Sequence, residues 1–218
     1  MRLFNVKTAV ICSALALCLG MPGAQAATDT KHPVKATKSS HSSKPSKPKP
    51  KSKAAKPVTP ATQAVSMLGG KFVFSLPKDY VKGPMEEIDD QAKAAGVSGS
   101  LYMNKAAKRV VIITETPLPD GNKVPSNDTR TLDNIIAETL VQQQSSYKDF
   151  KKLGEKKIVR KGLGLRQLDV SGSVDGGKVL STTIAAASGT RTAMVNVISL
   201  VKDAKAHTAV VKGVTGSK

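Results

Sequence analysis

The densest group of side chains that could perform chemistry is the acidic run Glu86-Glu87-Ile88-Asp89-Asp90. Paired carboxylates can support hydrolysis without a histidine, and oxygen ligands of this kind hold hard cations such as calcium. On a helix, Glu86 would share a face with Asp89 and Asp90. The same spacing also suits an ordinary helix start, where the positive end of the helix dipole stabilises acids. We favour the helix start and keep a metal-dependent hydrolase as an alternative.

Histidine, cysteine and serine give no complete catalytic set in the sequence. His32 and His41 fall in a lysine-rich tail and His207 falls in the last predicted helix. The predicted folded body between them therefore has no imidazole for proton transfer or metal ligation. No serine occupies a Gly-x-Ser-x-Gly turn. We expect no Ser, His and Asp arrangement, no catalytic residue, no metal site and no cofactor.

A second group of chemically active side chains is basic. It consists of Lys151, Lys152, Lys156, Lys157, Arg160 and Lys161. As a patch, these residues could bind an acidic partner or a lipid head group. As the solvated edge of a sheet, the same lysines would discourage pairing with another strand. The solvated edge is the favoured interpretation.

The first 26 residues have the pattern of a secretory signal peptide. Basic residues precede an apolar run over residues 8–20, and Ala24-Gln25-Ala26 forms a small-x-small cleavage site. The run falls short of the roughly 20 residues that a membrane-spanning helix needs. Cleavage after Ala26 would remove both cysteines, which excludes a disulfide and a thiolate site. Lipid attachment at Cys18 is an alternative that the bulky Leu17 before it disfavours.

Residues 27–64 have the composition of a disordered linker rich in Lys, Pro and Ser. The linker contributes much of the formal net charge of +18. In an exported protein its lysines could meet lipid head groups, lipopolysaccharide or cell-wall polymers, or they could belong to a solvated spacer. Export and the lack of aromatic residues for base stacking argue against nucleic acid as the natural partner. The candidate surface-binding residues are Lys44, Lys47, Lys49, Lys51, Lys53 and Lys56.

Residues 65–218 are predicted to form one domain, mainly of strands. Alternation of apolar residues and short glycine-containing links predict antiparallel neighbours. The run Val110-Val111-Ile112-Ile113 is apolar on both faces, as in a central strand. Two phases of apolar residues in one strand predict a bulge near Arg166-Gln167. The predicted strands are 71–76, 97–104, 108–116, 155–161, 164–174, 178–187 and 191–201.

Three helices complete the predicted domain, over residues 84–95, 129–147 and 203–214. Asp128 is placed to cap the second helix. That helix is expected to turn one polar side to water, formed by Asp133, Glu138, Gln142 and Gln143. The last helix is expected to bury Ala204, Val211 and Val214. The result is an α+β fold, an antiparallel β-sheet with helices packed on it.

The stretch Leu68-Gly69-Gly70-Lys71-Phe72-Val73-Phe74-Ser75-Leu76-Pro77 resembles the opening motif of the DcrB family of periplasmic proteins, which have the PsbP-like fold. Lys161-Gly162 and Gln167-Leu168-Asp169 resemble a later segment of that family. The resemblance spans about residues 65–202. It implies a PsbP-like α-β-α sandwich and an envelope protein associated with envelope integrity and with phage adsorption or DNA entry. It implies no catalytic residues.

The sequence therefore predicts a non-catalytic periplasmic protein with a binding or scaffolding role. The expected partners are envelope proteins or an anionic envelope surface. An adaptor or chaperone for secreted proteins and a hydrolase using Glu86 to Asp90 are the alternatives. The identity of the partner and the oligomeric state stay open.

Overall fold

The computed structural model describes residues 61–217. The predicted signal peptide (1–26), Cys18 and the six tail lysines Lys44 to Lys56 lie outside the described residues, as do His32 and His41. The described strands are β1 (Thr62–Met67), β2 (Phe72–Pro77), β3 (Val81–Gly83), β4 (Ser98–Asn104), β5 (Arg109–Pro117), β6 (Lys148–Arg160), β7 (Leu163–Val174), β8 (Gly177–Ser188) and β9 (Arg191–Leu200). The described α-helices are α2 (Asp90–Ala94), α3 (Thr129–Ser146) and α4 (Ala204–Thr215).

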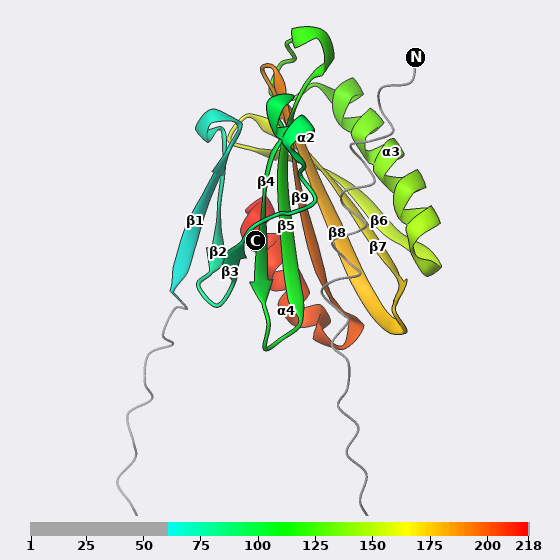
Figure 1. The fold of residues 1–218 in the computed structure, drawn as a ribbon. Helices are drawn as coiled ribbons and strands as arrows, with labels where there is room; N and C mark the ends of the chain where they lie inside the picture. Colours follow the sequence, from blue (N-terminus) through cyan, green and yellow to red (C-terminus); the bar gives the residue numbers. More distant parts are fainter. Residues whose placement is uncertain (1–60, 218) are drawn as a thin grey trace, which may run out of the picture. The chain divides into compact units, whose positions relative to one another are not determined.

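Seven of the strands form one antiparallel sheet in the order β3-β4-β5-β9-β8-β7-β6, and β1 and β2 form a separate hairpin (Figure 1). The short links predicted at Lys161-Gly162 and Asp175-Gly176-Gly177 are present as two-residue turns, because Gly177 already belongs to β8. Lys161, Gly162, Asp175 and Gly176 all have the positive φ that such hairpin turns require. β5 lies inside the sheet, and its run Val110 to Ile113 is buried as predicted. The α+β fold expected from the sequence is confirmed.

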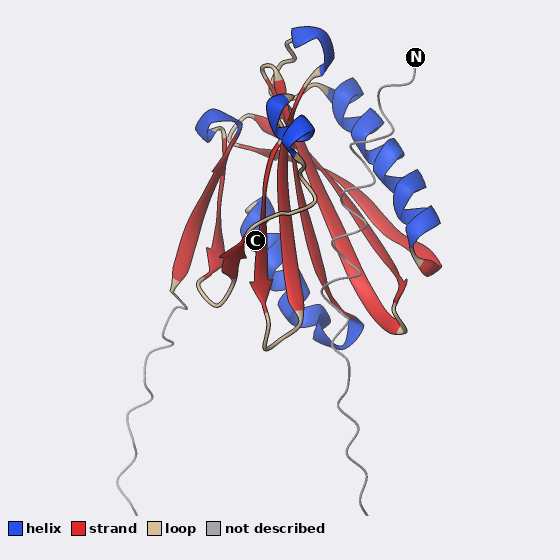
Figure 2. Ribbon diagram, in the orientation of Figure 1, coloured by secondary structure: helices blue, strands red, loops and turns tan. Residues whose placement is uncertain are grey.

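Both faces of the sheet are covered, because helices lie on each of them (Figure 2). α3 packs against β6, β7 and β8, and we call this face the α3 side. The opposite face, the α4 side, is covered by α4 and by the β1–β2 hairpin. Successive residues of an inner strand therefore enter opposite cores. In β5, Val111 packs on the α4 side and Ile112 on the α3 side.

This double burial corrects the predicted bulge near Arg166-Gln167. β7 pairs with β8 without a break in register. Leu163 and Leu165 belong to the core on the α4 side, whereas Leu168 and Val170 belong to the core on the α3 side. The two apolar phases are thus the two buried faces of one regular strand, and no bulge is needed to reconcile them.

Several elements also differ from the prediction. β1 and β3 were not predicted as strands, and β1 begins at Thr62, before the predicted domain start at residue 65. β6 begins at Lys148 and not at 155, because it is an edge strand whose charged residues hide the alternation on which the prediction rests. The helix predicted over 84–95 shrinks to α2, because Met85 and Ile88 are buried in a turn that precedes it.

α3 confirms the helix predicted over 129–147. The Asp128 carboxylate accepts a hydrogen bond from the backbone N–H of Thr131 at 2.8 Å, so it caps the helix as expected. The expected water-facing side is wrong for Gln143, which is only 5% exposed and donates to the Thr183 hydroxyl at 3.1 Å. Asp133 is exposed to water as expected, with 43% of its side chain accessible, and it also accepts a hydrogen bond from Arg166 of β7.

α4 confirms the last predicted helix with a different buried face. Val211 and Val214 are buried as expected, but Ala204 is exposed. His207 and Val210 are buried in its place. None of the described helices is long and apolar enough to span a membrane.

Gly172 in β7 lies directly beneath Tyr147, so the core should not tolerate a side chain there. A Cβ atom at this position would lie 2.6 Å from Tyr147 Cβ and 3.1 Å from the Lys148 carbonyl oxygen. We predict that Gly172→Ala lowers the free energy of unfolding by about 1–3 kcal/mol, measured by urea denaturation. Gly154→Ala in β6 is the matched control, because its Cβ would approach nothing closer than 4.0 Å. Equal effects of the two substitutions would refute this packing argument.

Candidate functional site

The predicted basic residues lie on or next to β6, which is an edge strand of the seven-stranded sheet. Among the described residues β6 pairs with β7 alone. The segment 148–161 holds seven basic residues and two acidic ones, a formal excess of five positive charges. This charged edge is the candidate functional site, and we call it the basic edge.

The structure divides the predicted patch between the two sides of the sheet. Lys157 lies opposite Arg166 and shares the α3 side with it, while Lys156 lies opposite Gln167 on the α4 side. Arg160 is on the α4 side as well, because it pairs with Leu163. The predicted residues are therefore neighbours along one strand, but they form two rows that meet at the sheet edge.

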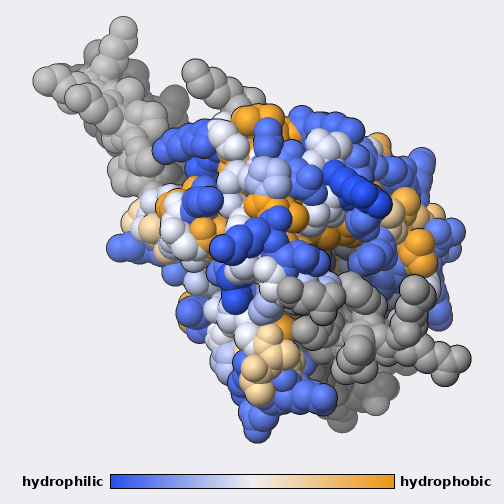
Figure 3. All heavy atoms as spheres, turned by 90° about the horizontal axis from the view of Figure 1, so that it is seen from above, coloured by the Kyte–Doolittle hydropathy of each residue, from blue (hydrophilic) through white to orange (hydrophobic). Residues whose placement is uncertain are grey.

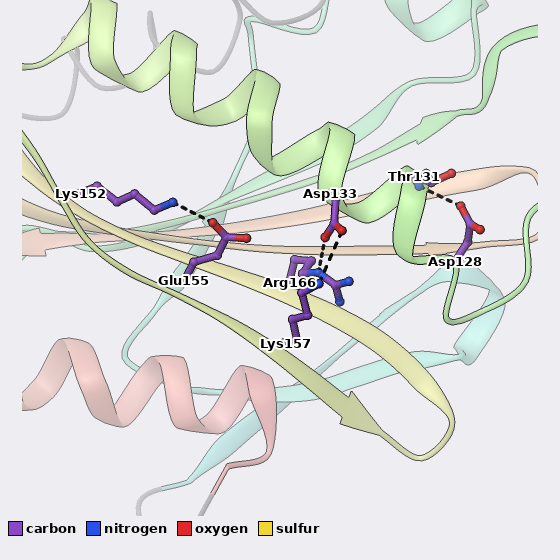
Figure 4. A network of polar contacts seen from close by, with 7 residues as sticks. All are labelled: Asp128, Thr131, Asp133, Lys152, Glu155, Lys157 and Arg166. Atoms are coloured by element: carbon purple, nitrogen blue, oxygen red, sulfur yellow. Dashed lines mark hydrogen bonds and ion pairs between the residues drawn. The ribbon is translucent and has the colours of Figure 1, made fainter.

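On the α3 side, Asp133 holds two of the cations (Figure 4). Its carboxylate accepts a hydrogen bond from Arg166 Nε at 2.6 Å and lies 3.6 Å from Lys157 Nζ. The Arg166 side chain is only 5% exposed, so Asp133 neutralises a buried charge that would otherwise be costly. The hydrogen bond from Arg166 holds the pKa of Asp133 below its usual value.

The remaining cations of the basic edge differ in their partners. Lys152 pairs with Glu155 at 2.8 Å, and the Arg160 guanidinium donates to the Val214 carbonyl at the end of α4. The side chains of four lysines have no hydrogen bond or ion pair within the described part of the chain. They are Lys148, Lys151, Lys156 and Lys161. Exposed pairs such as that of Lys152 are worth little, so most of this positive charge faces solvent uncompensated.

The surface seen from above is mostly hydrophilic, with apolar side chains in separate patches among polar ones (Figure 3). Protein-binding surfaces that depend on the hydrophobic effect show larger contiguous apolar areas. On this face of the molecule, charge is therefore a better guide than hydrophobicity to a binding region.

The acidic run does not form the helical face that a metal site would need. Glu86 and Glu87 precede α2, and Asp89 is its N-cap, accepting from the Ala92 N–H at 2.7 Å. Asp90 instead pairs with Lys93 at 3.1 Å. No group of three or more potential metal ligands is present among residues 61–217. Glu86 and Glu87 line a half-open hollow of about 920 Å³, together with residues of the paired strands β3 and β4.

His207, which the sequence placed in the last helix without a catalytic partner, is the centre of a buried polar network. His207 of α4 is 6% exposed and lies against the sheet. Its Nδ1 is 2.8 Å from the Ser199 hydroxyl, and its Nε2 is 2.8 Å from the Thr182 hydroxyl. Thr182 in turn donates to Asp169 at 2.6 Å. Ser199 lies in β9, Thr182 in β8 and Asp169 in β7.

The direction of these bonds fixes the proton on the imidazole. Because the Thr182 hydrogen is given to Asp169, Thr182 must accept from the Nε2–H of His207, which leaves Nδ1 to accept from Ser199. Burial lowers the pKa of His207, and the nearby Asp169 opposes that shift. His207 is therefore neutral at pH 7.

The order of groups resembles a proton relay, but its setting is that of a structural contact. Ser199 is 1% exposed and Thr182 is 2% exposed, so neither hydroxyl meets a substrate in this conformation. The network fastens α4 to three strands. The sequence showed it only as isolated polar residues in apolar strands, and nothing in their spacing indicated a common partner.

No family model and no curated protein matches the chain. Cyanobacterial PsbP (CyanoP) from Synechocystis is similar in structure, with a TM-score of 0.50, 9% identity, and coverage of 75% of this chain and 95% of that one. PA94 of Pseudomonas aeruginosa, a protein of unknown function, has a TM-score of 0.40 and 11% identity, with coverage of 72% of this chain and 95% of that one. LpqN of Mycobacterium tuberculosis, involved in cell envelope biogenesis, has a TM-score of 0.39 and 14% identity, with coverage of 75% of this chain and 85% of that one. The likeness to CyanoP shows the fold, which is the PsbP-like α+β fold predicted from the sequence.

His207 should make the stability of the protein depend on pH. Its folded pKa lies below the ordinary value of 6.5, so the folded protein binds fewer protons than the unfolded chain when the pH falls below that value. The contribution of neutral His207 to the free energy of unfolding is fully present above about pH 6.5. This contribution is lost as the pH falls toward and through the lowered pKa of the folded state. We predict that His207→Gln flattens the fall of the melting temperature across this range. An unchanged slope in the variant would show that other groups cause it.

Proposed function

We propose that this protein is a non-catalytic protein of the bacterial periplasm, exported by a cleaved signal peptide, that binds or scaffolds anionic components of the envelope. The observation that carries the proposal is the basic edge. There Lys151, Lys156 and Lys161 are exposed and free of partners within the described residues. A DcrB-type role in envelope integrity or phage adsorption belongs to the same proposal and rests on the sequence resemblance alone.

The linker would act together with the basic edge. A lysine close to an anionic surface contributes up to about 1 kcal/mol, and this attraction decays over about 8 Å at physiological salt. A single lysine is therefore weak, but the tail and the basic edge carry many. A chain that presents both should bind through the sum of many screened contacts, with a strong dependence on salt concentration.

The linker lysines are tested by deletion. We predict that removal of residues 31–56 releases the protein from membrane or cell-wall fractions into the soluble periplasmic fraction. The measurement is fractionation of cells followed by immunoblotting, at low and high salt. The proposal for the linker fails if the deleted protein fractionates as the full chain does.

The basic edge is tested by charge neutralisation. We predict that Lys151→Gln, Lys156→Gln and Lys161→Gln together weaken binding to phosphatidylglycerol vesicles about tenfold, because up to about 1 kcal/mol is lost at each position before screening. Co-sedimentation with vesicles measures the binding. The matched control replaces three lysines distant from β6 in the chain, which are Lys82, Lys105 and Lys108. An equal loss in this control would mean that net charge, and not the basic edge, governs binding.

A further inference from the structure

We infer that the basic edge accepts an extended acidic segment of a partner protein as an added β-strand, paired along Gly154–Arg160. This inference rests on the proposed function and names the partner of the same site. The partner would be held by backbone hydrogen bonds as well as by charge. A lipid or polymer surface, in contrast, offers charge but no peptide backbone that can pair with a strand.

Gly154–Arg160 has the regularity that strand addition requires. It pairs with the segment from Leu163 to Asp169 of β7 in unbroken register. The irregularities of β6 are confined to the pairs before it, between Lys148 and Lys151 and between Lys152 and Gly154. An edge strand leaves the outward backbone N–H and C=O groups of its regular part unpaired, and an extended peptide can bond to this row.

β3, the edge strand at the other end of the seven-stranded sheet, lacks a long regular segment of this kind. β3 comprises only Val81–Gly83 and is followed by Pro84. A strand of this length offers few outward backbone groups, and proline offers no N–H. Within the seven-stranded sheet, an added strand would therefore find its long regular template at β6.

The side chains of the basic edge select the charge of the incoming strand. Lys156 and Lys157 lie on opposite sides of the sheet, so an added strand would meet a cation on each of its faces. Directly opposite residues of paired strands lie about 4.5–5.5 Å apart at their Cβ atoms, a distance at which opposite charges attract and like charges repel. Val159, 74% exposed, adds an apolar contact.

The same charges disfavour the obvious competitor, which is a second copy of β6. Two such strands would bring their lysines against each other, and like charges in directly opposite positions destabilise a sheet. An acidic strand removes this repulsion. The net positive charge of the segment thus disfavours self-association while it permits pairing with one class of partner.

The test uses the full chain and a short synthetic peptide of repeated Glu-Glu-Val-Val, which as a strand carries glutamates on both faces, together with the same peptide N-methylated at every backbone nitrogen. Both peptides carry the same charge, but the methylated form cannot donate backbone hydrogen bonds. We expect the unmethylated peptide to bind, with protection of backbone amides in 154–160 from hydrogen exchange. N-methylation should weaken binding at least tenfold, and so should Lys156→Gln with Lys157→Gln, whereas Lys82→Gln with Lys105→Gln should not.

The outcomes separate this inference from the proposed function. If the lysine substitutions weaken peptide binding but N-methylation does not, the basic edge binds acidic chains by charge alone and the added strand is refuted. If neither peptide binds while phosphatidylglycerol vesicles bind through these lysines, the partner is a membrane surface and the inference again fails. If neither peptide nor vesicles respond to the lysines, the proposed function fails as well.

Discussion

The burial of the sheet on both faces is the constraint on which the rest of this structure depends. A sheet covered by α3 on one face and by α4 with a hairpin on the other leaves no open face for a ligand near its centre. A binding site on this sheet would then lie at its edges or on its loops. The edges are unequal, because β3 has three residues and β6 has thirteen. This inequality makes β6 the edge that offers the longer backbone row.

Two adjacent threonines of β8 show how both helices are held on this sheet. Thr182 bonds to His207 of α4, and the next residue, Thr183, bonds to Gln143 of α3. The alternation of a strand sends their side chains to opposite faces. Apolar contacts alone would let a helix slide along a row of Val, Ile and Ala, whereas a buried hydrogen bond is satisfied in one position only. These hydrogen bonds therefore fix the position of each helix on the sheet, whereas the apolar contacts account for most of its burial.

The sequence was informative where one residue type implies one local geometry. Lys161-Gly162 predicted a tight turn and Asp128 predicted a helix cap, and both are present. It failed where the outcome depends on distant packing. The charged start of β6 shows no alternation because neither of its faces is fully covered, and His207 gives no sign in the sequence that Ser199 and Thr182 converge on it. The basic residues were found by composition, but their division between two faces follows from the register with β7.

The chemistry of the basic edge also explains why the protein can tolerate a long exposed strand. Proteins commonly protect such edges with lysines, with bulges or with a short strand, because an open backbone row invites aggregation. Here the first part of β6 has bulges and the second part has lysines on both sides. Bulges disrupt the regular backbone row itself, whereas lysines act through charge, which repels basic strands and attracts acidic ones. In the strand addition inferred above, the lysines that protect the regular half of β6 would therefore also select an acidic partner.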